Sequence, residues 1–273
     1  MKKEINVKID HVGMFSNRFH PADVMFQLGF SGEGGCKKMP LDENGQPPRC
    51  MRFVFDNCYL EFAINRDPEK YGGAEHGINY FEFASTDIVV TRDNAVAQGF
   101  TTTDLVHATR EADHGEKKGT AVFECVALKD DVIPNIEVES VCHKTRELFY
   151  DNHRYLHDNG IDRVEGIILC NDDEDRVEKM IEDLDKFDRG LGDWGEGTAI
   201  RKIIVYDRDT LFREYGICVP KDCRNTGGII FEAPKGDLSL RTNQFGDSVR
   251  RTKDAVVVDL VEQQNVFFVI RNR

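Results

Sequence analysis

The sequence predicts an α+β protein built from tandem β-α-β-β-β units, and three observations lead to this prediction. Alternating apolar and polar residues indicate short strands, whereas the helical segments are few and end at glycine. The same order of elements occurs twice, at an offset of about 70 residues, and such an internal repeat is a property of the fold. A further strand-helix-strand pattern follows and predicts an additional C-terminal unit that contains a β-α-β motif.

The first unit begins with a strand in which apolar residues alternate with polar ones. Its helix starts at Asn17, which can cap it, and ends at Gly29. A loop rich in glycine and proline then leads to two strands that are separated by the turn Asp56-Asn57. The predicted elements are a strand at 5–15, a helix at 17–29, a strand beginning at 30–32, and strands at 50–56 and 58–64.

The second unit repeats this order and the glycine that ends the helix. Its helix follows Thr86-Asp87 and stops at Gly99, so that Gln98-Gly99-Phe100 matches Leu28-Gly29-Phe30 of the first unit. The predicted elements are strands at 77–84, 100–105, 119–127 and 134–142, and a helix from 86 to 98.

The rest of the chain divides at a segment rich in histidine, tyrosine and asparagine. We predict a paired-unit domain at 1–145, a connecting segment at 146–160, and an additional α+β module at 161–273 that resembles a further β-α-β-β-β unit. The predicted elements of the last module are a helix at 172–189 and strands at 163–170, 199–206, 228–233, 237–241, 255–261 and 265–271.

Composition excludes several classes of protein. The chain of 273 residues carries 36 basic and 49 acidic side chains, and its net charge of -13 argues against nucleic acid and anionic lipid as partners. No stretch approaches the about 18 apolar residues of a membrane helix. The eight cysteines form no CxxC pair, and no apolar leader follows the first residues, so we expect a cytoplasmic protein with reduced cysteines.

Several short motifs resemble one superfamily. The first unit opens with Asp10-His11-Val12-Gly13 and ends in the strand Tyr59-Leu60-Glu61-Phe62, and His157-Asp158-Asn159-Gly160 precedes a later strand. Together with the tandem order, these motifs resemble the vicinal oxygen chelate superfamily and, within it, the glyoxalase-like domain family of glyoxalase/bleomycin resistance/dioxygenase type. The resemblance covers about residues 5–170 and implies that the units curl into half-barrels of one mixed sheet.

The resemblance also implies a divalent metal ion, bound by residues on the first and last strands of each unit. In the first unit these residues are His11 and Glu61. In the second unit Tyr80 matches His11, so the candidates are His76 in the preceding loop and Glu137 on the last strand. Imidazole and carboxylate ligands suit Zn, Fe, Mn or Ni, and they leave the identity of the metal open.

Catalytic and substrate-binding residues are predicted around this site. Glu61, Glu137 and Glu139 are the candidate catalytic carboxylates; the last two share one face of a strand, which points either to water or to the site. Glu165 is an alternative partner from the third unit. We expect the connecting segment to cross the mouth of the barrel, and a strand arginine to bind an anionic substrate or pair with a neighbouring glutamate. The predicted substrate-binding residues are Arg52, Tyr59, Tyr80, His143, His157 and Asn159.

The function implied by the resemblance is a metal-dependent isomerase, lyase or dioxygenase that acts on a small oxygen-rich substrate. The alternative is a metal-free protein of the same fold that binds a small molecule in an aromatic cleft. That cleft would draw on Phe53, Phe55, Tyr59, Phe81 and Phe123, although alternation assigns some of these rings to the helix side of the sheet. A homodimer is a third possibility, because the apolar last strand, Val266 to Ile270, is predicted to be exposed.

Overall fold

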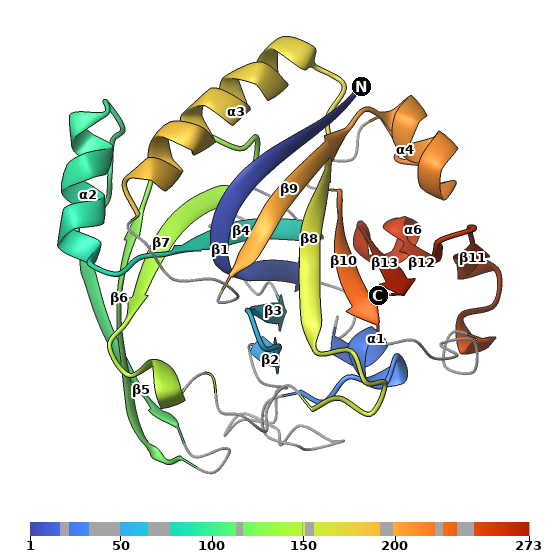
Figure 1. Ribbon diagram of the computed structural model, residues 1–273, viewed down its shortest axis with the longest axis horizontal. Helices are drawn as coiled ribbons and strands as arrows, with labels where there is room; N and C mark the ends of the chain where they lie inside the picture. The colour runs from blue at the N-terminus through green and yellow to red at the C-terminus, as the bar shows by residue number, and fades with distance from the viewer. Residues whose placement is uncertain are drawn as a thin grey trace.

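The computed structural model contains one curled mixed sheet, which has thirteen strands in the described part of the chain (Figure 1). The strand order is β11-β12-β13-β10-β8-β9-β1-β4-β7-β6-β5, with β3 beside β1 and β2 beside β3. The structure describes residues 1–16, 22–32, 50–64, 77–112, 117–148, 150, 156–191, 199–221, 226–233 and 243–272. The predicted α+β fold class, with its tandem units and curled sheet, is confirmed.

Along the chain the elements form four successive groups, and in each group the first and last strands are neighbours in the sheet. The first comprises β1 (Lys2–Ser16), α1 (Ala22–Gln27), β2 (Cys50–Val54) and β3 (Tyr59–Ile64). The second comprises β4 (Gly77–Ala84), α2 (Ile88–Ala97), β5 (Val106–Ala112), β6 (Gly119–Ala127) and β7 (Glu137–His143). The third comprises β8 (Arg163–Cys170), α3 (Glu174–Arg189), β9 (Ile200–Tyr206) and α4 (Arg208–Tyr215). The fourth comprises β10 (Gly227–Ala233), β11 (Val249–Arg251), β12 (Ala255–Leu260), α6 (Val261–Gln264) and β13 (Val266–Asn272).

Strand pairing shows that the four groups share one plan. The first and last strands of each group pair in parallel, as β1 with β3, β4 with β7, β8 with β9, and β10 with β13. The groups then join in twos through antiparallel pairs of their first strands, β1 with β4 and β8 with β10. We call the part built on β1–β7 the first half and the part built on β8–β13 the second half.

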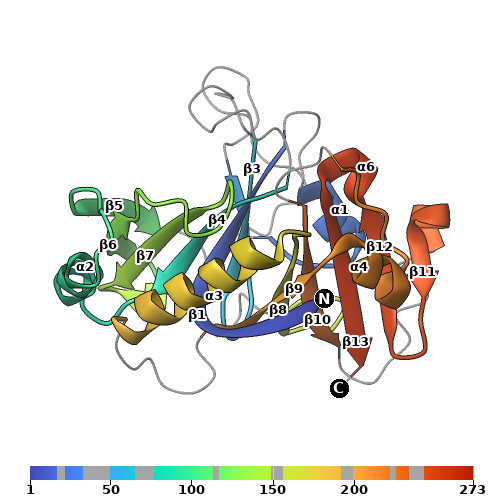
Figure 2. The same cartoon turned by 90° about the horizontal axis from the view of Figure 1, so that it is seen from above.

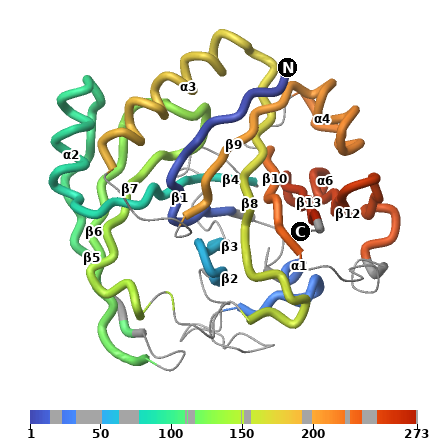
Figure 3. Tube along the Cα trace, viewed as in Figure 1, coloured from blue at the N-terminus to red at the C-terminus, as the bar shows by residue number. Residues whose placement is uncertain are grey.

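The two halves meet along β1. Its beginning, Lys2–Ile9, pairs with β9 of the second half, and its end lies between β3 and β4. Figure 2 shows β4 to β7 with α2 at one end of the molecule and β11 to β13 at the other, and Figure 3 shows the curved path of β1 that connects them. The additional C-terminal unit is therefore part of the same sheet, and the domain boundaries 1–145, 146–160 and 161–273 stay a prediction.

The repeated Gly-Phe motif ends helices and does not start strands. Gly29 and Gly99 have positive φ angles of 85° and 92°. The N–H of Phe30 bonds to Met25 O and that of Phe100 to Ala95 O, which is the Schellman pattern of a helix C-terminus. The predicted strand at 100–105 is therefore wrong, since β5 begins only at Val106, and residues 30–32 form no strand. The structure adds α4, which the sequence did not predict, and the predicted strand at 237–241 lies outside the described residues.

One face of the first half is apolar and carries the helices. Val12, Phe81 and Val138 alternate with polar neighbours and are almost completely buried. Phe187 of α3 packs edge-on against Phe83 of β4, with ring centroids 5.4 Å apart. The polar residues of the same strands must therefore point to the opposite face. No helix in the described ranges is long and apolar enough to cross a membrane.

Candidate functional site

Two rows of polar and aromatic side chains cross the first half on the face opposite the helices. Strand register sets both rows, because side chains of paired residues lie next to each other on one face of a sheet. The first row consists of Tyr59, His11, Glu82 and Glu139, which are paired in turn on β3, β1, β4 and β7. The second row consists of Arg52, Glu61, Gly13, Tyr80 and Glu137, which are paired on β2, β3, β1, β4 and β7.

Gly13 makes room for an aromatic ring in the second row. A Cβ atom at this position would lie 1.8 Å from Cε1 of Tyr80, which is far inside van der Waals contact. The Tyr80 ring therefore lies directly over the backbone of β1. The same ring stands edge-on to His11, with centroids 5.8 Å apart, and forms one wall around the imidazole.

A β-bulge at Asp10 brings two consecutive side chains to the same face. Ile9 pairs with Phe83 and His11 with Glu82, so that Asp10 is left without a partner on β4. In a regular strand Asp10 and His11 would point to opposite faces, and a bulge of this kind re-aims a side chain. The bulge is therefore the local feature that places an aspartate beside the central histidine.

Asp10 is a buried hub for four cationic or hydrogen-bonding groups, three on its carboxylate and one on its main-chain oxygen. Its Oδ1 lies 3.0 Å from His11 Nδ1 and 3.1 Å from His143 Nε2. Its Oδ2 accepts a hydrogen bond of 3.2 Å from Arg146 Nη1, and the Tyr150 hydroxyl donates to its main-chain oxygen. Burial opposes ionisation of this carboxyl, but His143 and His11 outweigh it and hold the pKa of Asp10 well below its usual value.

His11 is clamped on both sides of its ring. Nε2 lies 3.0 Å from the Tyr59 hydroxyl and 3.2 Å from Glu82 Oε1, while the Tyr59 ring stacks on the imidazole at 4.0 Å. Burial lowers the pKa of His11, yet the negative charges of Glu82 and Asp10 prevail and raise it to about 10. The surroundings of His11 therefore favour the protonated form of its imidazole.

The carboxylates of the two rows are close enough to influence one another. Burial, together with the negative charges of Glu82 and Glu137, raises the pKa of Glu139 to about 8. Cys125 of β6 lies 3.9 Å from Glu82 Oε2, and burial raises the pKa of its thiol well above the usual value. A concentration of carboxylates around a histidine favours bound cations or shared protons over free negative charge.

The described residues contain a group that can hold a divalent ion. Ligand atoms of Asp10, His11 and His143 all lie within 4.8 Å of one another, and all three side chains are buried. His11 Nε2 and Glu82 Oε1 form a second close pair, at 3.2 Å. Nitrogen and oxygen donors of this kind fit Zn and other first-row divalent metals, with ligand distances of about 2.0–2.2 Å. The residues present therefore fit the metal that the resemblance implies.

Most of the predicted site residues come together in or beside the two rows. Glu61 forms an ion pair with Arg52 at 3.0 Å. This contact corresponds to the second alternative above, in which the strand arginine pairs with a neighbouring glutamate. His143 reaches the same region by way of Asp10. The predicted residues that gather here are His11, Arg52, Tyr59, Glu61, Tyr80, Glu137, Glu139 and His143.

His157 and Asn159 lie apart from this group. His157 Nδ1 accepts a hydrogen bond of 3.0 Å from Ser31 N, and its ring packs beside Phe55, which is on the helix side of the sheet. Burial lowers the pKa of His157 to about 4. The Asn159 side chain donates to Leu28 O. Both residues fasten the backbone after α1, so the structure does not bring them to the polar rows, and His76 lies outside the described residues.

Strand pairing and ion pairs also bear on the expected aromatic cleft, the expected exposed last strand and the alternative partner Glu165. Phe53, Phe55 and Phe81 are completely buried, and they alternate with the row residues, so these rings belong to the helix side and do not line a cleft. The last strand β13 pairs on both edges, with β10 and β12, and is buried, so the predicted exposed strand is wrong. Glu165 forms ion pairs with Lys202 and Arg271 in the second half and does not join His11.

The predicted site residues did not include four contributors: Asp10, Glu82, Arg146 and Tyr150. Asp10 stands in the Asp-His motif, and Glu82 follows Tyr80 by two residues on the same face, so both positions carried a signal. The bulge that turns Asp10 toward His11 depends on pairing with β4, and a single strand sequence does not reveal it.

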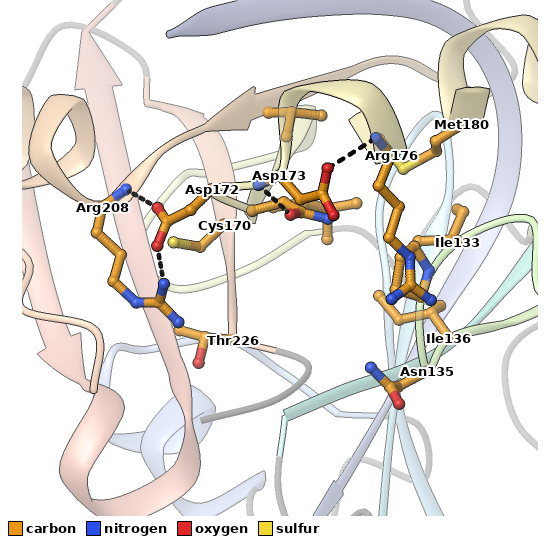
Figure 4. Close-up of a pocket in the computed structure, with 14 residues that line it drawn as sticks. Ile133, Asn135, Ile136, Cys170, Asp172, Asp173, Arg176, Met180, Arg208 and Thr226 are labelled. Atoms are coloured by element: carbon orange, nitrogen blue, oxygen red, sulfur yellow. Dashed lines mark hydrogen bonds and ion pairs between the residues drawn. The ribbon is translucent and has the colours of Figure 1, made fainter. Parts of the chain in front are cut away.

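A separate cavity of about 270 Å³ lies between the segment before β7, the start of α3 and the start of α4 (Figure 4). Arg208 bonds to Asp172 in its wall, and Arg176 pairs with Asp131 at 2.5 Å. None of the described residues predicted for the site lines it, and these arginines pair with aspartates of the protein.

The solved structures that match almost the whole length of this chain include the following two. A hypothetical protein from Staphylococcus aureus has 9% sequence identity and a TM-score of 0.56, with 97% of this chain and 99% of that chain covered. A xylose isomerase-like TIM barrel/4-hydroxyphenylpyruvate dioxygenase fusion protein has 13% identity and a TM-score of 0.53, with 99% of this chain and 49% of that chain covered.

What is shared is the fold. Streptomyces coelicolor methylmalonyl-CoA epimerase aligns with 50% of this chain and 97% of its own, at 15% identity and a TM-score of 0.33. No protein-family model and no curated protein matches the sequence. The fold shared with the two long matches is thus established. Membership of the vicinal oxygen chelate superfamily, and of the glyoxalase-like domain family within it, stays a prediction.

Proposed function

We propose that this protein is a divalent-metal-dependent enzyme of vicinal oxygen chelate type that acts as an isomerase, lyase or dioxygenase on a small oxygen-rich substrate. The observation that supports this proposal most directly is the row Tyr59, His11, Glu82 and Glu139. In this row the His11 imidazole, held by its neighbours, faces the Glu82 carboxylate on the next strand. The fold shared with 49% of a xylose isomerase-like TIM barrel/4-hydroxyphenylpyruvate dioxygenase fusion protein supports the same class.

In this proposal His11 holds the metal through Nε2, and Glu82 supplies an oxygen from the neighbouring strand. Their donor atoms are 3.2 Å apart, about the separation of two ligands that share one ion at 2.0–2.2 Å each. Glu61, which the resemblance implies as a ligand, forms an ion pair with Arg52 and has no place in the ligand set proposed here. A bound divalent ion would act as a Lewis acid toward substrate oxygens.

The side chains around this pair would bind and orient the substrate. Tyr59 and Tyr80 flank the imidazole with their rings and limit access of water to it. Arg52 is held by Glu61, which keeps its guanidinium 5.7 Å from the Tyr59 ring centroid, at the edge of the same face. Glu139 is in register with Glu82 on the next strand, and we assign it the transfer of a proton to or from the substrate.

The test is metal analysis of the untagged, unchelated full chain. The wild-type protein is expected to carry about one equivalent of a divalent metal, and His11→Gln is expected to lose it, because the central nitrogen ligand is gone. Glu61→Gln should keep the metal, and so should His107→Gln, which removes an exposed imidazole. Full retention of metal by His11→Gln, or its loss in Glu61→Gln alone, would contradict the proposed ligand set.

A further inference from the structure

We infer that Asp10 is a positioning residue, which holds the His11 ring so that Nε2 faces Glu82 and Tyr59, and that Asp10 is not itself a metal ligand. This inference rests on the proposed function for the metal that His11 binds. It goes beyond that proposal because it assigns separate roles to the members of a buried Asp10, His11 and His143 group.

The first argument is the direction in which the His11 ring is held. Nδ1 lies 3.0 Å from Asp10 Oδ1 and Nε2 lies 3.2 Å from Glu82 Oε1, so the two nitrogens face different carboxylates. Only the Nε2 side belongs to the row that continues through Glu82 to Glu139. A ligand histidine whose other nitrogen donates to a carboxylate is the usual arrangement around protein-bound metals.

The second argument is that both Asp10 oxygens already have partners. Oδ1 lies within hydrogen-bond distance of two imidazoles, and Oδ2 accepts from Arg146, whose guanidinium lies 3.9 Å from the Tyr150 ring centroid. The Asp10 side chain is completely buried. A divalent cation bound to this carboxylate would sit beside a guanidinium, and the repulsion between the two positive charges disfavours that position.

The third argument is the β-bulge. Because of the bulge, Asp10 has no pairing partner on β4. As a consequence, the side chains of Asp10 and His11 point to the same face of the sheet. A carboxylate behind a ligand imidazole fixes the ring orientation and raises its basicity, and removal of such a partner weakens metal affinity about 10–100-fold.

Co²⁺ titration of the metal-free full chain, followed by its visible absorption bands, tests the inference. Asp10→Asn is expected to bind Co²⁺ about 10–100-fold more weakly with the bands at unchanged wavelengths, because the ligand atoms stay the same. His11→Gln should show no saturable binding. Asp56→Asn, which removes a partly exposed partner of Arg163, serves as the matched control and should behave as wild type.

Two outcomes would overturn the inference. Shifted bands in Asp10→Asn, or a loss of binding as complete as that of His11→Gln, would make Asp10 a ligand. Wild-type affinity in Asp10→Asn would remove its positioning role. Failure of the wild-type chain to bind Co²⁺ would instead refute the proposed function.

Imidazole NMR of the wild-type chain decides the positioning role even if Asp10→Asn does not fold. We expect a downfield His11 Nδ1–H signal in the metal-free protein, because this proton is shared with Asp10. On addition of Zn²⁺ the Nε2 resonance should shift while Nδ1 keeps its proton. Absence of the Nδ1–H signal in the metal-free chain, or its loss on Zn²⁺ binding, would overturn the inference.

Discussion

The two halves of the sheet have the same strand plan, but their corresponding faces differ in chemistry. In the first half this face carries the polar rows around His11. In the second half the side of the sheet opposite the main core is filled by apolar residues of β8, β9, β10 and β13, and Leu211 and Tyr215 of α4 pack on them. The residues of this filled face include Ile168, Ile204, Ile230, Phe267 and Val269, all of them buried.

Both halves contain an aromatic ring that lies over a glycine of the neighbouring strand, but the two rings have different surroundings. Tyr80 lies over Gly13 in the first half, and Phe267 lies over Gly228 in the second, where a Cβ would come within 2.3 Å of the ring. Tyr80 is only partly buried and borders His11, whereas Phe267 is completely buried. The strand plan therefore provides a curved surface, and the side chains decide whether that surface becomes a site or a core.

The largest expected effect comes from removing the aromatic ring on each face. Phe267→Ala should lower the free energy of unfolding by about 3–5 kcal/mol, because it leaves a cavity in a closed core. Tyr80→Ala should cost about 1 kcal/mol, since its half-buried ring has solvent on one side. Urea unfolding of both variants checks this. Equal losses would mean that the first face is as tightly filled as the second.

The next effect concerns the layer beneath the polar rows, where His157 is buried against Phe55. The folded chain keeps this imidazole neutral to a pKa of about 4, while the unfolded chain protonates it near 6.5. Unfolding therefore takes up a proton between these values, and stability should fall as the pH drops from 6.5 to 4, by up to about 3 kcal/mol.

His157→Gln should remove this part of the acid sensitivity, as measured by thermal unfolding across the pH range. His107→Gln is the control, because its ring is exposed. If the stability of His157→Gln depended on pH in the same way as that of the wild type, water would have to reach the His157 imidazole, and the layer beneath the polar rows would be hydrated.

The smallest effect is expected from adding a methyl group at the two glycines. Gly228→Ala should destabilise by about 1–3 kcal/mol, because the buried Phe267 ring has no space to retreat. Gly13→Ala should cost less, since Tyr80 can turn toward solvent, but it should disturb the surroundings of His11. Urea midpoints measure the first effect, and Co²⁺ affinity measures the second. A larger stability loss in Gly13→Ala would reverse the comparison.

Much of the fold was predictable from local patterns. Alternation in β1 and β4 and the 3/4 spacing of Val177, Met180 and Leu184 in α3 depend on nearest neighbours along the chain, and the structure has these elements close to the expected residues. The Gly-Phe repeat was correctly recognised as a repeat, but its role was misread. The Phe30 N–H bonds within the helix terminus, and the ring packs on Phe55 and Phe231, far away in sequence.

The sequence by itself determined the fold class and the tandem order of the units, because side-chain period and helix caps are local properties. The tertiary structure alone decided which residues meet. Register across β3, β1, β4 and β7 placed Glu82 rather than Glu61 beside His11, and the bulge turned Asp10 toward the same ring. Pairing between distant strands sets both features. The packing of α4 on the second half is likewise a tertiary feature, and it makes that face a core.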